Sequence, residues 1–193
     1  DDEYDDDDDS QRDPVVLNAF TIEAGVPGTW DRIGGTVAEE NNGDDLFELA
    51  TAPAQGFAPD TLITTQLYPK TRIFTPRGVE LDRTALTLER RVLVDGILAL
   101  AQDSADNNIL RSALIIAGSD TEDGGRESLE GELLTIDDIT LTIATDTGDR
   151  CVLAGEAVIL EVSTEGDGFE TMEIALEDLQ SGQQLVSTAI STP

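Results

Sequence analysis

The chain has 193 residues, 39% of them hydrophobic, and it carries 41 acidic against 11 basic residues for a net charge of −30. This charge argues against a nucleic-acid ligand, whose phosphates are bound by lysine and arginine, and against docking on an anionic membrane face. The apolar runs fall far short of the roughly 20 residues of a membrane-spanning helix, so the sequence predicts a protein that does not cross a bilayer.

The acidity also indicates the solvent in which the protein works. A large net charge destabilises a compact fold by self-repulsion, and molar salt removes that penalty by shortening the Debye length to roughly 3 Å. Ten of the basic residues are arginine, and Lys70 is the single lysine. We therefore expect a halophilic protein. The alternative is an acidic protein of ordinary salt with a disordered tail.

Residues 1–13, DDEYDDDDDSQRD, open the chain with nine acidic residues and one arginine. Like charges at this density predict an acidic N-terminal tail with no core of its own. The remainder, residues 14–193, is expected to be one β-sandwich domain. Tyr4 is the one aromatic residue of the tail. It is the candidate apolar anchor if the tail docks on a neighbouring subunit.

From Pro14 onward, short strand-like runs follow one another. Apolar and polar residues alternate with a period of two, which is typical of sheets that face water on one side. This pattern predicts a β-sandwich or a barrel. The runs are PVVLNAFTIEA, DLFELATA, DTLITTQLYPKTRIFTP, TALTLERRVLVDGILALAQD, NILRSALIIAG, DDITLTIATDTGDRCVLAGEAVILEVSTEG, FETMEIALEDL and QQLVSTAIS.

Glycine, proline and acidic clusters predict where the strands are interrupted. GVPGTWDRIGG (25–35) is interpreted as a loop or bulged turn, and SDTEDGGRESLEGE (119–132) as a loop. Asp95-Gly96 predicts a hairpin turn, and Pro69 predicts a break in its strand. Residues 168–182 are compatible with a strand or with an amphipathic helix, and the strand is favoured.

The residues that most enzymes use are missing. The chain has no histidine and a single cysteine, Cys151, which is expected to be a buried small hydrophobe. These counts exclude Ser-His-Asp catalysis and the usual zinc sites, and no phosphate-binding glycine motif is present. We predict no enzymatic activity and no cofactor. A small β-barrel enzyme that uses two carboxylates is kept as an alternative.

Four acidic loops are candidate cation sites, although none matches a twelve-residue calcium loop. Solvated turns are the simpler interpretation. The acidic residues concerned are Asp103, Asp106, Asp120, Asp123, Asp146, Asp149, Glu165 and Asp167.

The basic residues cluster in one stretch of the sequence. Two interpretations remain open: pairing with nearby carboxylates of the same chain, or an interface that meets an acidic surface of a neighbour, such as its opening tail. The candidate interface residues, together with Tyr4, are Lys70, Arg72, Arg77, Arg83, Arg90 and Arg91.

The size, charge and strand-rich segments, such as TLITTQLYPKTRIFTP and DDITLTIATDTGDRCVLAGEAVILEV, define a profile. This profile resembles the smaller single-jelly-roll major capsid proteins of icosahedral, internal-membrane haloarchaeal viruses. The resemblance covers residues 14–193 and carries no catalytic motif.

The resemblance implies an all-β fold, a single jelly-roll β-sandwich of about eight strands. It also implies a structural virion protein that assembles in the cytoplasm of a halophilic host. Its partners would be itself and a second, larger capsid protein, in pseudo-hexameric capsomers of a shell above an inner viral membrane. The first alternative is a surface, adhesion or virion decoration module.

Overall fold

The structure, a computed structural model, describes residues 17–27, 30–39, 45–52, 57–58, 61–99, 108–118, 126–165 and 168–191. The predicted tail, residues 1–13, lies outside these ranges. Within them the chain forms strands and two short 3-10 helices, η2 (Arg83–Ala85) and η3 (Leu176–Asp178), so the predicted all-β fold is confirmed. The strands are β1 (Leu17–Ala24), β2 (Asp31–Glu39), β3 (Leu46–Thr51), β4 (Leu62–Phe74), β5 (Glu80–Leu81), β6 (Arg91–Ala99), β7 (Ile109–Ala117), β8 (Arg126–Asp137), β9 (Thr140–Thr145), β10 (Gly148–Leu153), β11 (Val158–Glu165), β12 (Gly168–Glu173) and β13 (Gln184–Ser191).

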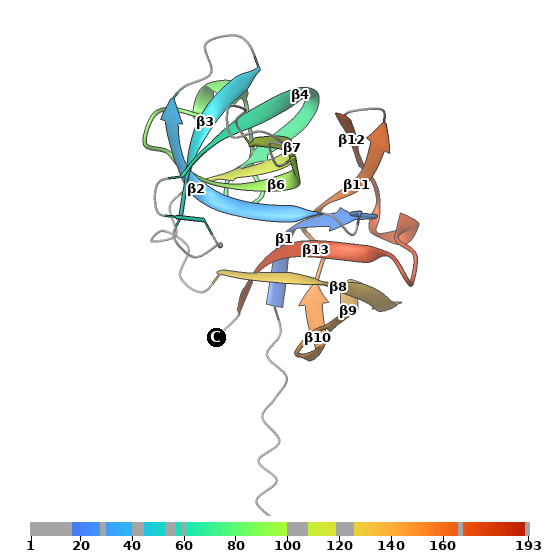
Figure 1. The fold of residues 1–193 in the computed structure, drawn as a ribbon. Helices are drawn as coiled ribbons and strands as arrows, with labels where there is room; N and C mark the ends of the chain where they lie inside the picture. The colour runs from blue at the N-terminus through green and yellow to red at the C-terminus, as the bar shows by residue number, and fades with distance from the viewer. Residues whose placement is uncertain are drawn as a thin grey trace, which may run out of the picture.

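Strands from both ends of the sequence close into one ring, which we call the terminal barrel (β1, β8, β9, β10 and β13; Figure 1). They are hydrogen-bonded in the order β10-β9-β8-β13-β1, and β10 pairs in parallel with the start of β1. Leu17 lies opposite Val152 in this closing pair. Aliphatic side chains such as Leu133, Leu141 and Ile143 fill the interior.

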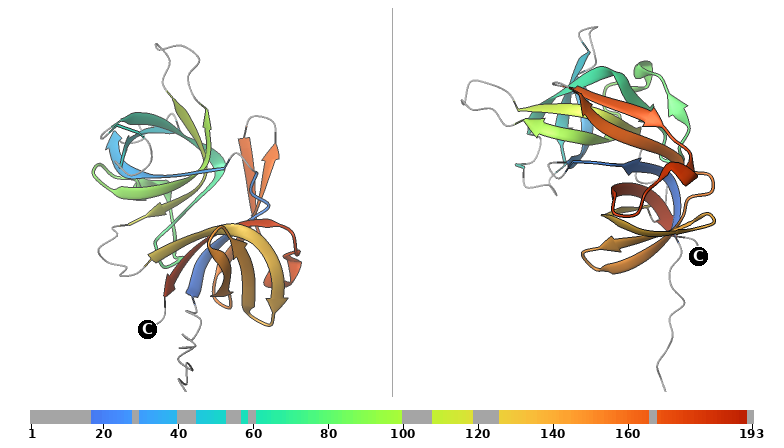
Figure 2. Two further views of the ribbon diagram at one scale, coloured as in Figure 1. Left: turned by 60° about the horizontal axis from the view of Figure 1, so that its bottom comes forward. Right: turned by 90° about the vertical axis from the view of Figure 1, so that its right-hand side faces the viewer.

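The segment between β1 and β8 forms a second ring, which we call the inserted barrel (β2, β3, β4, β6 and β7; Figure 2). Its strand order is β3-β2-β6-β7-β4, β3 pairs with β4 to close it, and β5 extends it beside β4. Leu49, Ile63, Val94, Leu110 and Ile115 fill its core. The described residues thus hold thirteen strands in a seven-stranded and a six-stranded sheet, whereas the jelly roll implied by the resemblance has about eight.

The alternation in the sequence explains why these segments form strands with one buried face. In β3, Phe47, Leu49 and Thr51 are buried while the residues between them are partly exposed. In β4 the buried residues alternate up to Leu67, and the pattern resets at exposed Pro69. Proline cannot donate a ladder hydrogen bond, and the register of β4 against β7 shifts at this place. The predicted break at Pro69 is therefore a shift in register within one long strand.

The remaining two strands, β11 and β12, form a hairpin that we call the arm. It belongs to the sheet of the terminal barrel, because β11 pairs in parallel with the second half of β1. The arm then rises along the inserted barrel, where β12 lies against β4 and β7 (Figures 1 and 2). Leu160 and Val158 of the arm pack with Phe74, Leu114 and Ile116 of the inserted barrel.

Three turn predictions are wrong in whole or in part. Asp95 and Gly96 lie inside β6 rather than in a hairpin turn, because the irregularity there is a bulge in the pairing of β6 with β7. A side chain at Gly96 would meet the carbonyl oxygen of Arg111 at 1.9 Å, so this glycine serves a close approach of two strands. Residues 31–35 belong to β2 and residues 126–132 to β8, because both pair along their length with neighbouring strands.

The segment 168–182 follows the favoured interpretation in its first part. Residues Gly168–Glu173 form β12, and the short helix η3 follows at Leu176. The acidic loop with Asp146 and Asp149, interpreted from the sequence as a solvated turn, lies between the antiparallel strands β9 and β10.

Candidate functional site

The first two residues of the basic stretch pair with carboxylates of the arm and of β5. Lys70 and Arg72 lie on β4, where Lys70 contacts Glu170 of β12. Arg72 pairs with Glu80 of β5 and with Glu173 of β12, the latter at 3.5 Å. The guanidinium of Arg72 also lies over the ring of Phe74, 5.2 Å from its centroid. These contacts hold the arm against the inserted barrel.

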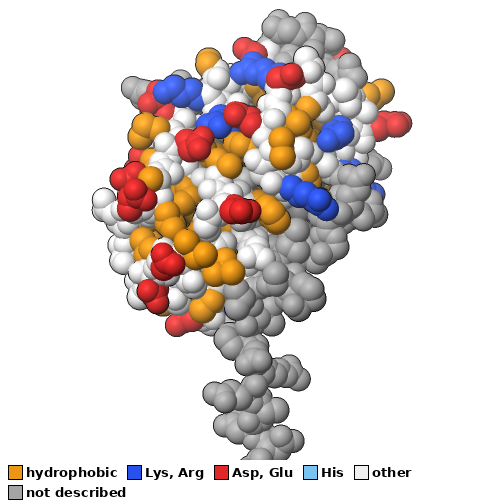
Figure 3. Space-filling view, turned by 180° about the vertical axis from the view of Figure 1, so that it is seen from behind, with side chains coloured by type: hydrophobic (Ala, Val, Ile, Leu, Met, Phe, Trp, Pro, Cys, Tyr) orange, Lys and Arg blue, Asp and Glu red, His pale blue; other side chains and the backbone are white. Residues whose placement is uncertain are grey.

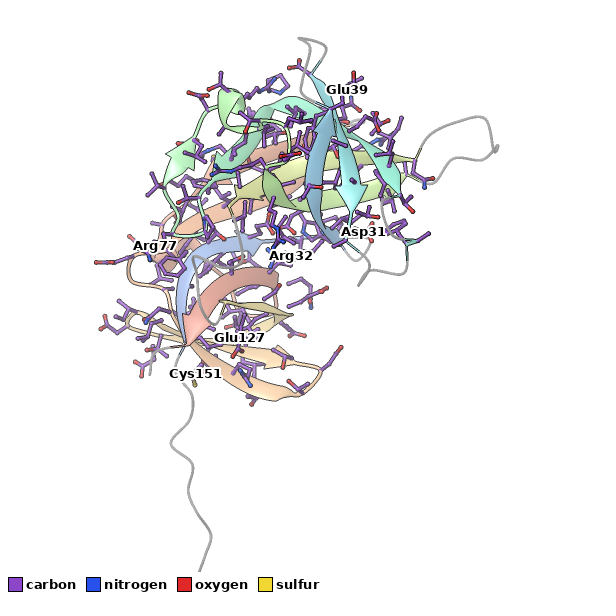
Figure 4. All side chains as sticks on the ribbon, turned by 90° about the vertical axis from the view of Figure 1, so that its left-hand side faces the viewer. Asp31, Arg32, Glu39, Arg77, Glu127 and Cys151 are labelled. Carbon is purple, nitrogen blue, oxygen red and sulfur yellow. The ribbon has the colours of Figure 1, made fainter. Side chains whose placement is uncertain are left out.

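The other basic residues of the stretch are distributed around the inserted barrel. Arg83 of η2 pairs with Asp45. Arg90 donates to the carbonyl oxygen of Ala117 at 3.3 Å, and Arg91 begins β6. Exposed Arg77 lies in the turn after β4 (Figure 4). Pairing within the chain therefore accounts for Lys70, Arg72 and Arg83. The interface interpretation stays a prediction, as does that of Tyr4, which lies outside the described residues.

A different group of charges meets at the junction between the two barrels. Arg32 of β2 and Asp95 of β6 are cross-strand partners in the inserted barrel. Arg32 Nε donates to Asp95 Oδ1 and Nη2 donates to Oδ2, each at 2.6 Å. Arg32 Nη1 donates across the junction to Ser128 of β8. Figure 4 shows Arg32 between the sheets of the two barrels.

The third member is Glu23 of β1, in the terminal barrel. Strand geometry places Ile22 and Ala24 in the core of that barrel, and Glu23 therefore points the opposite way, toward Arg32. Its Oε2 lies 3.9 Å from Arg32 Nη2. The side chain of Glu23 is 1% exposed and that of Asp95 is 0% exposed. We call Glu23, Arg32 and Asp95 the junction triad.

Burial, and then the negative charge of Asp95, raise the pKa of Glu23 well above its ordinary value. The positive charge of Arg32 lowers the pKa of Glu23. Hydrogen bonding to Asp95 raises this pKa further, and hydrogen bonding to the indole of Trp30 lowers it slightly. Burial alone would lower the pKa of Arg32, but the charge and hydrogen bonds of Asp95, with help from Glu23, raise it instead. The guanidinium therefore stays charged, and Glu23 is the member that takes up a proton.

Apolar side chains surround the junction triad. Val186 of β13, which lies opposite Glu23, packs with Val26, Ala113 and Val162, and the half-buried Trp30 completes the cluster. Two carboxylates with one perturbed pKa are the feature that the enzyme alternative requires. Here both are closed off from solvent by packed strands, so a substrate cannot contact them in this conformation. The two carboxylates instead interact with Arg32 at the contact between the barrels, and Glu23 takes up a proton.

The junction triad is not among the residues predicted from the sequence, although the sequence carries a signal for it. Glu23 follows the run AFTI, and Asp95 interrupts VLVDGILAL, so each is a single charge within an apolar strand. Buried charges are paired, so two such positions indicate a shared partner. The partner was missed because the segment that carries Arg32 was interpreted as a loop.

Most of the acidic-loop residues that were candidate cation ligands lie in parts of the chain that the structure leaves undescribed. Asp146 and Asp149 are described and exposed, at the turn between β9 and β10. Among the described residues, three or more potential metal-ligating side chains do not come together. Cys151 was predicted to be buried, but it is half-buried on β10, because its neighbour Val152 takes the inward position (Figure 4).

Comparison of the chain with known protein families, curated proteins and solved structures found no match. In the described ranges, no helix has the length and apolar character needed to cross a membrane.

Proposed function

We propose that the protein is a structural building block of a virion shell, assembling in high salt through contacts with copies of itself and with a second, larger capsid protein. The observation that carries the proposal is the joining of two closed barrels into one body. The junction triad, the apolar cluster beside it and the arm all link the barrels. A subunit that must keep one shape while it contacts many neighbours is stabilised by such contacts between its barrels.

The surface properties support the same proposal. The net charge of −30 suits molar salt, in which repulsion between subunits is screened. Apolar side chains stand among the charged ones on the back face (Figure 3). Leu62, Val79, Leu88 and Met172 are each more than half exposed. High salt strengthens the burial of such groups, so contacts between subunits can form under the conditions that screen the charge.

The resemblance implies a single jelly roll, which is an antiparallel sandwich of eight strands. That finer assignment stays a prediction. Three parallel pairs, β1–β10, β1–β11 and β4–β7, weigh against it. In the proposal, each chain therefore contributes two joined barrels to the shell.

The test is the mass of the native assembly. The full chain in about 3 M salt is expected to sediment as oligomers that dissociate as salt falls toward about 0.1 M, where screening weakens. Met172→Asp on the exposed side of β12 is expected to weaken assembly, and Thr147→Asp in the exposed turn between β9 and β10 is the matched control. A full chain that stays monomeric in high salt, alone and with virion proteins, would contradict the proposal and favour a decoration or adhesion module.

The tail is tested in the same experiment. Deleting residues 1–13 removes the acidic run, whereas changing its acidic residues to Asn and Gln keeps the length and removes the charge. If the tail docks on a basic surface of a neighbour, both variants weaken assembly. If it only adds charge, both leave assembly intact or strengthen it.

A further inference from the structure

We propose that the protonation state of Glu23 controls how tightly the two barrels are joined at the junction triad. A proton bound to Glu23 keeps the junction closed. Loss of this proton lets water enter and loosens the barrels from each other on this side. The proposal concerns the chain itself and does not depend on the proposed function.

The junction triad holds two carboxylates and one guanidinium. Arg32 and Asp95 both belong to the inserted barrel and form a complete pair with two 2.6 Å hydrogen bonds. Glu23 comes from the terminal barrel and adds a second carboxylate to a guanidinium that is already satisfied. An ionised Glu23 would therefore place an excess negative charge in a site that is 1% exposed. Uncompensated buried charge is strongly unfavourable, and a bound proton removes the charge.

Within the described ranges, no second cation is found to act on Glu23. The charged groups that act on Glu23 and Arg32 are each other, Asp95 and, on β8, Glu130, which adds further negative potential. Trp30 contributes a weak donor. With Glu23 protonated, the junction triad is neutral overall, and the negative charge of Asp95 favours this protonated form. The raised pKa of Glu23 agrees with this count.

The position of the triad explains why the proton would control a movement. Opening the junction separates Glu23 from the Arg32–Asp95 pair and leaves that pair intact within the inserted barrel. Opening also breaks the contact of Arg32 with Ser128. The chain leaves β1 at Gly25, whose φ is 75°, and Trp30 precedes β2. Glycine tolerates this left-handed backbone, so the chain can turn there.

The pH window follows from linkage. In the open state Glu23 is solvated and titrates near its ordinary value of about 4.3. In the closed state its pKa is raised. The closed state is therefore fully favoured below about pH 4.3, and its advantage falls roughly tenfold per pH unit until the raised pKa is passed. A rise in pH therefore favours the open junction.

Trp30 is the single tryptophan of the chain and lies at the junction, so it reports opening directly. The experiment measures quenching of its fluorescence by acrylamide, which is uncharged, for the full chain in about 3 M salt between about pH 4.5 and 9. Circular dichroism at each pH follows the strand content. The quenching constant is expected to rise along a single titration while the strand signal stays constant.

Glu23→Gln keeps the shape and removes the titration, so its quenching constant is expected to stay low at every pH. Glu156→Gln, in the exposed turn after β10, is the matched control and is expected to titrate like the unchanged protein. Should Glu23→Gln fold poorly, Asp95→Asn gives an independent test. This variant leaves Glu23 as the one carboxylate for Arg32, so Glu23 can ionise without placing excess negative charge in the junction. The rise of the quenching constant with pH is therefore expected to shrink or vanish.

Three results would overturn the proposal. They are a quenching constant that does not change with pH in the unchanged protein, a rise that persists in Glu23→Gln or in Asp95→Asn, and loss of the strand signal in step with the quenching. The last result would show that the proton governs unfolding of the whole chain instead of the junction.

Discussion

Arg32 holds Asp95 with two parallel hydrogen bonds of 2.6 Å, one from Nε and one from Nη2, across the pair of strands β2 and β6. This two-point geometry matches the planar guanidinium to the planar carboxylate and fixes both side chains. The third guanidinium nitrogen is then directed across the junction to Ser128. One arginine thus links the inserted barrel to the terminal barrel.

Replacing Arg32 by Met is expected to destabilise the protein strongly. The change leaves Asp95 buried without a cation, and breaking a buried ion pair in this way costs about 3–5 kcal/mol. The free energy of unfolding in denaturant at constant salt measures it. Arg150→Met is the control, since Arg150 pairs with Glu127 at 2.7 Å between partly exposed side chains, and such pairs contribute about 0–1 kcal/mol. Equal losses in the two variants would contradict the assigned role of Arg32.

Gly96→Ala is expected to lower stability by about 1–3 kcal/mol, because its new methyl group would overlap a strand that cannot easily move. The added carbon would lie 1.9 Å from the carbonyl oxygen of Arg111 in β7. Gly34→Ala is the matched control, since its added carbon would meet no atom closer than 3.6 Å. Thermal melts of the two variants test the bulged pairing of β6 with β7. Equal melting temperatures would contradict it.

Thr21→Val is expected to stabilise the protein by about 1 kcal/mol or more, because a buried hydroxyl that lacks a partner carries a desolvation penalty. Thr21 is 2% exposed, and its Oγ1 has no hydrogen-bond partner in the described part of the chain. Thr171→Val is the matched variant, and it is expected to lower the stability. Its hydroxyl donates to the carbonyl oxygen of Lys70 at 2.7 Å, and its loss leaves that bond between arm and barrel unmade. Chemical denaturation of both variants should give shifts of opposite sign.

The melting temperature is expected to fall as salt is reduced from about 3 M to about 0.1 M, because repulsion among surface carboxylates is no longer screened. A chain lacking residues 1–13 is expected to keep most of this dependence, since the greater part of the net charge lies outside the tail. Melting temperatures independent of salt would contradict the halophilic prediction.

The sequence predicted those parts of the fold that depend on local pattern. The alternation in β3 and β9 is visible because each has one face in a barrel core. The turn between β9 and β10 was predicted because its acidic and glycine residues act locally. Residues 31–35 of β2 and Gly96 were misassigned because glycines there serve contacts with distant strands, and such contacts leave no local signal.

The junction triad could not be predicted for the same reason, because it depends on contacts between distant strands. Glu23 and Asp95 are recognisable as charges in apolar strands, but their meeting depends on how two barrels pack. The basic stretch was prominent in the sequence, yet Lys70 and Arg83 pair with carboxylates far along the chain. Proximity in sequence indicated a patch, and the folded chain places Lys70 and Arg83 in separate ion pairs, while the interface interpretation of the stretch stays a prediction.

The pairing of β1 with β13 has a consequence for synthesis on the ribosome. The terminal barrel takes its first strand from one end of the sequence and its last from the other, whereas the inserted barrel uses only the stretch from β2 to β7. The inserted barrel can therefore fold as soon as β7 has emerged, while β1 must wait for β8 to β13, which are translated later. Contacts of such long sequence separation form slowly, and unpaired strand edges invite association with other chains. Until β13 is made, the acidic run that precedes β1 in the sequence (residues 1–13) is expected to repel other nascent chains and so to oppose aggregation at that edge.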